Sequence, residues 1–111
     1  MKNKNNIIPK NLEECIITLE KNLSKKEIEA LKNGILTPIS LHSSLGMAIR
    51  NNWGLWQDSE LKKWFNNLGI QHPDDMSGII LKSFVNHLKG EKIDLDGMIT
   101  YYKGYWGKER K

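Results

Sequence analysis

The sequence predicts an all-α fold, a compact single-domain bundle of about six short helices. Apolar residues recur at the spacing of one helical face through most of the chain. Glycines and helix-capping residues separate these segments, and hardly any segment alternates in the manner of a β-strand. The 111 residues are enough for one domain with a buried core, so folding requires neither a metal nor a disulfide.

The first two helices are predicted from their caps. Asn11 is placed as the N-cap of the first helix, with Glu14 in its first turn. Ser24 and Glu27 have the spacing of a capping box, in which both side chains accept backbone N–H groups at a helix start. Gly34 is placed to end the second helix. The apolar positions are Leu12, Cys15, Ile16, Leu19 and Leu23 in the first helix and Ile28 and Leu31 in the second.

A third helix follows a loop through Thr37 and Pro38, and we expect it to begin between Pro38 and Ser43. If this helix is continuous, His42 and Arg50 lie on roughly the same side of it. Gly54 then stops or bends it. Its apolar positions are Leu45, Ala48, Ile49 and Trp53.

Three further helices complete the predicted bundle. Asp58 and Ser59 offer caps for a short fourth helix, which Gly69 closes. The fifth helix follows Pro73 and is apolar over most of its circumference, which predicts a central position. The sixth begins near Asp94. The apolar positions of these helices are Leu61, Trp64, Phe65 and Leu68; Met76, Ile79, Ile80, Leu81, Phe84, Val85 and Leu88; and Leu95, Met98, Ile99, Tyr102 and Trp106.

The helical domain is predicted to span residues 9–106, with a flexible N-terminal arm at residues 1–8 and a frayed tail at residues 107–111. Cys15 is the only cysteine, which excludes an internal disulfide. The N-terminal segment lacks the apolar run of a signal peptide, and no stretch is apolar enough to cross a membrane. We therefore expect a cytoplasmic protein.

The net charge of +4 comes from lysines spread over both ends and the exposed helix faces. Such a distribution is typical of a solvated surface, and no segment has the dense basic stripe of a nucleic-acid-binding protein. We therefore do not expect a nucleic-acid partner. Arg50 and Arg110 are the only arginines in a chain that otherwise uses lysine.

The segment His-Pro-Asp-Asp-Met-Ser at residues 72–77 permits two interpretations. Proline suits the first turn of a helix, and Asp74 and Asp75 place negative charge at the positive end of the helix dipole. Together with His72, these aspartates also supply nitrogen and oxygen atoms that a metal could bind. Their spacing matches no standard metal motif, so we expect neither a metal nor a cofactor.

Arg50 lies between Ile49 and Trp53, where its planar guanidinium offers five donors that a lysine cannot imitate. Its partner is either a carboxylate of this chain, with Asp74 or Asp75 as candidates, or an anionic group on a ligand. If Arg50 contacts a ligand together with Trp53, Trp56 and His72, replacing it by lysine should barely weaken the free protein. We take this second possibility as the hypothesis. Core packing is the alternative for both tryptophans, and a structural role is the alternative for His42.

The runs LHSSLGMAIRNNWGLW and HPDDMS resemble a family of small bacterial proteins described as domain of unknown function 6794. The resemblance extends from about Pro9 to Trp106. It implies a shared fold and a shared site but no particular chemistry. The residues that match the motif positions, and that we take as candidate ligand- or partner-binding residues, are His42, Arg50, Asn51, Trp53, Trp56, His72, Asp74, Asp75 and Ser77.

Three classes of function remain open. We favour a binding module whose polar and aromatic pocket takes a small anionic ligand or a protein partner, because arginine and tryptophan most often anchor binding. The second class is an immunity or anti-defence inhibitor that covers a partner or sequesters a signal molecule. The third is an enzyme that uses His72 with Asp74 or Asp75 as acid and base or as metal ligands. No nucleophile motif or phosphate-binding loop supports catalysis. The oligomeric state is left open.

Overall fold

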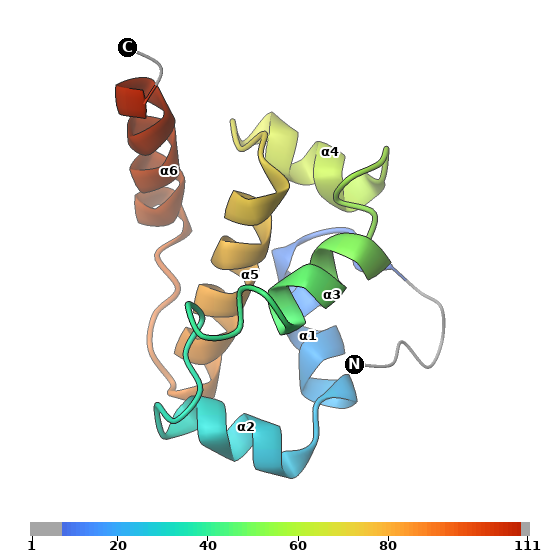
Figure 1. Cartoon of the computed structure of the whole chain (residues 1–111), viewed down its shortest axis with the longest axis vertical. Helices are drawn as coiled ribbons and strands as arrows, with labels where there is room; N and C mark the ends of the chain where they lie inside the picture. The colour runs from blue at the N-terminus through green and yellow to red at the C-terminus, as the bar shows by residue number, and fades with distance from the viewer. Residues whose placement is uncertain (1–7, 110–111) are drawn as a thin grey trace.

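The computed structural model describes residues 8–109, and among these the side chains up to residue 104. This part of the chain contains helices and no strand, which confirms the predicted all-α bundle (Figure 1). The helices are α1 (Leu12–Asn22), α2 (Lys25–Lys32), α3 (Leu45–Asn52), α4 (Glu60–Asn67), α5 (Pro73–Leu88) and α6 (Leu95–Glu109). None of the described helices is long and apolar enough to cross a membrane.

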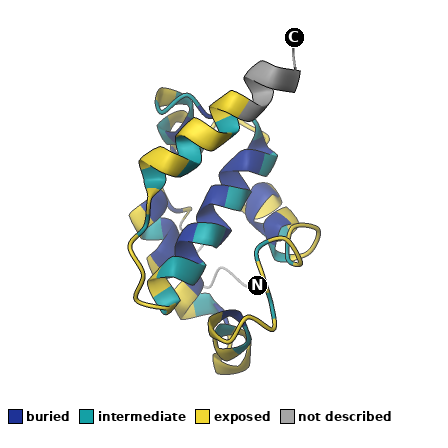
Figure 2. Cartoon of the chain, turned by 90° about the vertical axis from the view of Figure 1, so that its left-hand side faces the viewer, coloured by how far each residue is buried: buried dark blue, intermediate teal, exposed yellow. Residues whose placement is uncertain are grey.

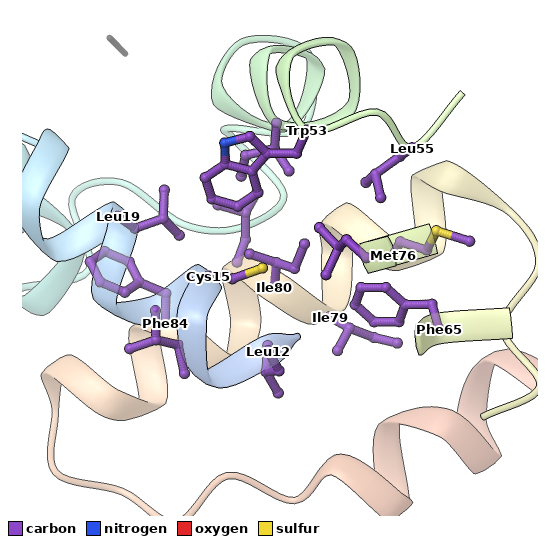
Figure 3. Packing of buried hydrophobic residues seen from close by; sticks show 14 of the residues in the cluster. Leu12, Cys15, Leu19, Trp53, Leu55, Phe65, Met76, Ile79, Ile80 and Phe84 are labelled. Atoms are coloured by element: carbon purple, nitrogen blue, oxygen red, sulfur yellow. The ribbon is translucent and has the colours of Figure 1, made fainter. Parts of the chain in front are cut away.

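Helix α5 is the centre of the fold, as its hydrophobicity predicts, and it packs against α1, α2, α3 and α6. Figure 2 shows it as a largely buried helix among partly exposed ones. Figure 3 shows Phe84 and Ile80 of this helix among core side chains from α1, with Trp53, the C-cap of α3, nearby. Cys15 is fully buried in the same cluster, and burial raises the pKa of its thiol, so it is a core side chain rather than a nucleophile.

The predicted caps are present. The Asn11 side chain accepts the backbone N–H of Glu14, and the two side chains of the Ser24–Glu27 capping box make both expected hydrogen bonds. Ser59 caps α4 by accepting the N–H of Lys62. Local sequence patterns therefore set the beginnings of these three helices.

The third helix begins at Leu45, so the expectation that it starts between Pro38 and Ser43 is wrong. Residues 37–44 form successive turns instead. Thr37 and Ser40 hold the first turn, because each backbone N–H donates to the other residue's side-chain oxygen. Such local side-chain hydrogen bonds compete with helix formation. His42 therefore lies outside α3, and the prediction that one continuous helix carries it with Arg50 is wrong as well.

Helix α6 lies beside α5 on one flank of the molecule and leaves much of its surface exposed (Figures 1 and 2). The Tyr102 hydroxyl lies over Gly78 of α5, where an added Cβ would be only 2.7 Å from it. The predicted apolar position at Trp106 lies outside the described side chains, and the predicted arm at residues 1–8 lies outside the described part apart from Ile8. Within the predicted tail, the backbone is helical through Glu109.

Candidate functional site

Arg50 is the centre of a buried polar network between α3 and the start of α5. Arg50 lies in the last turn of α3 and is only 5% exposed. One terminal nitrogen donates to Ser77 Oγ at 2.8 Å, and the other donates to the backbone oxygen of His42 at 3.1 Å. Arg50 Nε lies 3.4 Å from Asp74 Oδ1, which makes an ion pair. Of the two kinds of partner considered for Arg50, the structure shows the internal carboxylate.

The ion pair differs in kind from the two hydrogen bonds. Arg50 Nε lies within ion-pair distance of Asp74 but is not aligned to donate a hydrogen bond to it. Each charge is also favourable for its own helix. The Arg50 cation lies at the end of α3 and the Asp74 carboxylate at the beginning of α5, where each complements the helix dipole. Asp74 keeps a half-exposed side chain, so the pair is buried on the arginine side only.

Gly46 leaves the space that the guanidinium occupies. It lies one helical turn before Arg50, and an added Cβ would be 3.1 Å from Arg50 Nη1 and 3.3 Å from the backbone oxygen of Leu41. The space needed by the guanidinium therefore explains why a glycine stands at position 46 of the LHSSLGMAIRNNWGLW run. A side chain at position 46 would displace the arginine from its partners.

The residues of the HPDDMS run both start α5 and hold Arg50. His72 is the N-cap, and its Nδ1 accepts the backbone N–H of Asp74 at 3.1 Å. The same Nδ1 lies 3.9 Å from Asp74 Oδ2, a contact that is an ion pair only when the imidazole is protonated. Ser77 Oγ donates to the backbone oxygen of Asp74 at 3.0 Å while accepting from Arg50. The helix-cap interpretation is thus correct, and the same residues have a second role.

A groove of about 430 Å³ lies above this network, and we call it the α5–α6 groove. The turns before α3 form one wall, α6 forms the other, and α5 forms the floor. The lining residues are Pro38, Ile39, His42, Ser43, Asp74, Asp75, Gly78, Lys82, Tyr101 and Tyr102. The groove therefore combines carboxylates, a lysine and two phenol rings with exposed aliphatic groups.

Tyr102 and Asp75 line both the groove and a second pocket of about 330 Å³. That pocket is lined by Gly69, Ile70, Gln71, His72, Asp75, Tyr102 and Lys103. Burial raises the pKa of Tyr102, and the neighbouring Asp75 and Tyr101 raise it further. The phenol between the two pockets therefore remains protonated at neutral pH and is available as a hydrogen-bond donor.

A comparison with protein families supplies the relationship that the motifs suggest. The model of a domain of unknown function, DUF6794, matches residues 8–88. The chain belongs to this family. No curated protein and no solved structure matches it. The DUF6794 match includes Arg50, Asp74 and Ser77 but ends before α6, so the expected likeness over residues 89–106 lies outside it.

The DUF6794 chain brings six of the nine candidate residues together: His42, Arg50, His72, Asp74, Asp75 and Ser77. The other three are elsewhere. Trp53 is fully buried, and Figure 3 shows its indole pointing into the core toward Cys15 and Ile80, as the core-packing alternative predicts. Trp56 is 54% exposed and Asn51 is exposed, and neither lines the groove or the second pocket.

Sequence reasoning missed the aromatic side of the site. Tyr101 and Lys82 are not among the residues that the sequence predicts for the site, and Tyr102 is predicted only as an apolar position of the last helix. Lys82 follows Asp74 and Gly78 at intervals of four residues along α5, which places all three on one face. That spacing was the available signal. Among the side chains that the structure describes, no three histidines, cysteines or acids are arranged to hold a metal ion.

Proposed function

We propose that the protein is a binding module whose α5–α6 groove docks a segment of a protein partner. The observation that carries this proposal is the rim of the groove, where Ile39 is 86% exposed and Tyr101 is 61% exposed. Large apolar side chains around a polar hollow are typical of interfaces in which a few anchor residues enter a pocket. The groove supplies the polar groups that would fix the orientation of the partner.

The lining of the groove favours a protein segment over a small anion. Asp74 and Asp75 contribute carboxylates to the lining and Lys82 contributes one ammonium group, so the lining carries no excess of positive charge for a small anion. The guanidinium of Arg50, which the sequence suggested as an anion-binding group, points inward and is engaged by three partners. An inhibitor that covers its target would use the same groove, so inhibition is one form of the proposed binding.

Selection from a displayed library of random peptides tests the proposal. We expect the protein to enrich a family of peptides that carry an aliphatic or aromatic anchor. Ile39→Ser should then weaken the binding of a synthetic selected peptide by about tenfold or more, since a small polar side chain replaces an apolar rim contact without adding a charge. Isothermal titration calorimetry measures this affinity.

Ile35→Ser is the matched control. Ile35 is 76% exposed in the same connection between α2 and α3 but does not line the groove. Both substitutions lie at exposed positions, so neither should change stability by more than about 0.5 kcal/mol. Peptides that bind Ile39→Ser and the unchanged protein equally, an equal loss in Ile35→Ser, or no enriched peptide at all would contradict the proposal.

A further inference from the structure

We infer that the α5–α6 groove recognises a basic side chain of its partner, with arginine preferred; this inference rests on the proposed function. The groove already holds a cation of its own. Lys82 Nζ lies 5.3 Å from the ring centroid of Tyr101 and 5.3 Å from that of Tyr102. Both distances are within the range of a cation–π interaction, so the two rings together make a seat for a positive charge.

The arrangement of the two rings and the carboxylates supports a cation at this position. The rings of Tyr101 and Tyr102 pack edge to face, with centroids 5.1 Å apart and planes at 79°. Asp75 is buried on the floor beside them, and its charge is felt at the Tyr102 phenol, where it helps to keep the proton bound. Asp74 adds a second, half-exposed carboxylate to the same lining. A cation that enters the groove therefore meets the two tyrosine rings and the exposed part of the Asp74 carboxylate.

The ammonium group of Lys82 lies over the two tyrosine rings, and an arginine of the partner can displace it. Lys82 is half-exposed, and a lysine–tyrosine contact at such a site is weak. An arginine from the partner stacks its planar guanidinium on an aromatic ring and donates two parallel hydrogen bonds to a carboxylate. It would thus make contacts that Lys82 does not make. The Lys82 ammonium would swing toward solvent on its flexible stem.

Nuclear magnetic resonance titration with two small probes tests this inference. The probes are N-acetyl-arginine amide and N-acetyl-citrulline amide, which has nearly the same shape and no charge. We expect the arginine probe to shift the amide resonances of Ser43, Asp75, Tyr101 and Tyr102, and the citrulline probe to bind at least about threefold more weakly because it lacks the charge. Equal binding of the two probes, or shifts confined to residues outside the groove, would overturn the inference.

Removing the charge of Lys82 gives a second test, in which the affinity for the arginine probe should rise rather than fall. Lys82→Met keeps an unbranched side chain and removes the competing charge, so affinity for the arginine probe should rise about threefold or more. Lys103→Met is the control, because it removes the same charge from α6 at a residue that lines the second pocket and not the groove. An affinity that falls in Lys82→Met, or that rises equally in both variants, would overturn the inference.

The proposed docking and the inferred preference for a basic side chain can be contradicted separately. Selected peptides that depend on Ile39 but carry no basic residue would overturn the inference and leave the proposed docking in place. Conversely, an arginine probe that binds at Tyr101 and Tyr102 in a charge-dependent way, in a protein that enriches no peptide, would support the cation seat and contradict the peptide-docking function.

Discussion

The two walls of the α5–α6 groove are held in different ways. The wall formed by the turns before α3 is fixed by Arg50, a buried side chain with three partners on two segments. The wall formed by α6 rests on side chains that are only partly buried, namely Leu95, Met98, Ile99 and Tyr102, the last of which lies over Gly78. Local stability follows the density of buried contacts, so the buried Arg50 network that anchors the first wall should open only with global unfolding, and α6 should detach at lower cost. One side of the groove is therefore preformed, and the other is adjustable.

The largest expected effect is on the fixed wall. Arg50→Lys should lower the free energy of unfolding by about 2 kcal/mol, because lysine keeps the charge but cannot reach all three partners with one ammonium group. The midpoint of denaturant unfolding measures this loss. The structure thus reverses the expectation of a barely weakened protein that the sequence suggested.

A double-mutant cycle with Ser77→Ala checks that the loss comes from the network. The two substitutions should be non-additive, since Ser77 Oγ is one of the groups that Arg50 binds. An unchanged midpoint in Arg50→Lys would show that the network contributes little, and it would return Arg50 to the role of a ligand-binding residue.

Gly46→Ala tests the same wall with a smaller change. The added methyl group meets a guanidinium that its partners hold in place, so we expect a net destabilisation of about 1 kcal/mol despite the better helix propensity of alanine. Gly104→Ala is the control, because an added Cβ there meets no atom within 4 Å. It should stabilise α6 slightly. A Gly46→Ala protein as stable as the unchanged one would mean that Arg50 yields easily and that the wall is not fixed.

Gly78→Ala tests the adjustable wall. Its Cβ would be 2.7 Å from the Tyr102 hydroxyl, which is the far end of a side chain and can move away with α6. We expect global stability to change by less than about 1 kcal/mol, since helix propensity offsets the lost contact. Backbone amides of α6 should lose protection from hydrogen exchange while those of α5 keep it. Uniform loss of protection over both helices would show that the two walls are one cooperative unit.

The smallest expected effect is a pH dependence. The pKa of Tyr102 is raised above its ordinary value of 10.0, chiefly by burial, so the folded protein holds this proton more tightly than the unfolded chain does. The resulting stabilisation is present below pH 10 and is lost as the pH rises through the folded-state value. Denaturation midpoints measured between neutral and alkaline pH should therefore fall, and Tyr102→Phe should fall less. Identical profiles would exclude Tyr102 as the group responsible.

The helices were predictable because their signals are local. Asn11, Ser24 and Ser59 cap helices through hydrogen bonds to residues three positions away, and such spacing is visible in the sequence. The beginning of α3 was not predictable in this way. The turns that replace its first residues are held partly by Arg50, which donates to the backbone oxygen of His42, and that contact exists only in the folded chain.

The candidate site was only partly predictable from the sequence. Residue chemistry pointed to an arginine–aspartate pair, and the structure shows Arg50 with Asp74. Residue chemistry did not distinguish Trp53, which fills the core, from Trp56, which is exposed, because both belong to one short aromatic motif. The tyrosines of α6 reach the groove through the packing of one helix on another, for which a single sequence offers no direct signal.

The family match ends at residue 88, before the helix that carries both tyrosines. A chain that kept residues 8–88 and carried a different segment after them would retain the arginine network, the core helix and both carboxylates. It would lose the two aromatic rings that seat a cation. Exchanging α6 would therefore change the rings that a partner meets in the groove, and the new helix would have to supply apolar side chains where Leu95, Met98 and Ile99 now pack against the core.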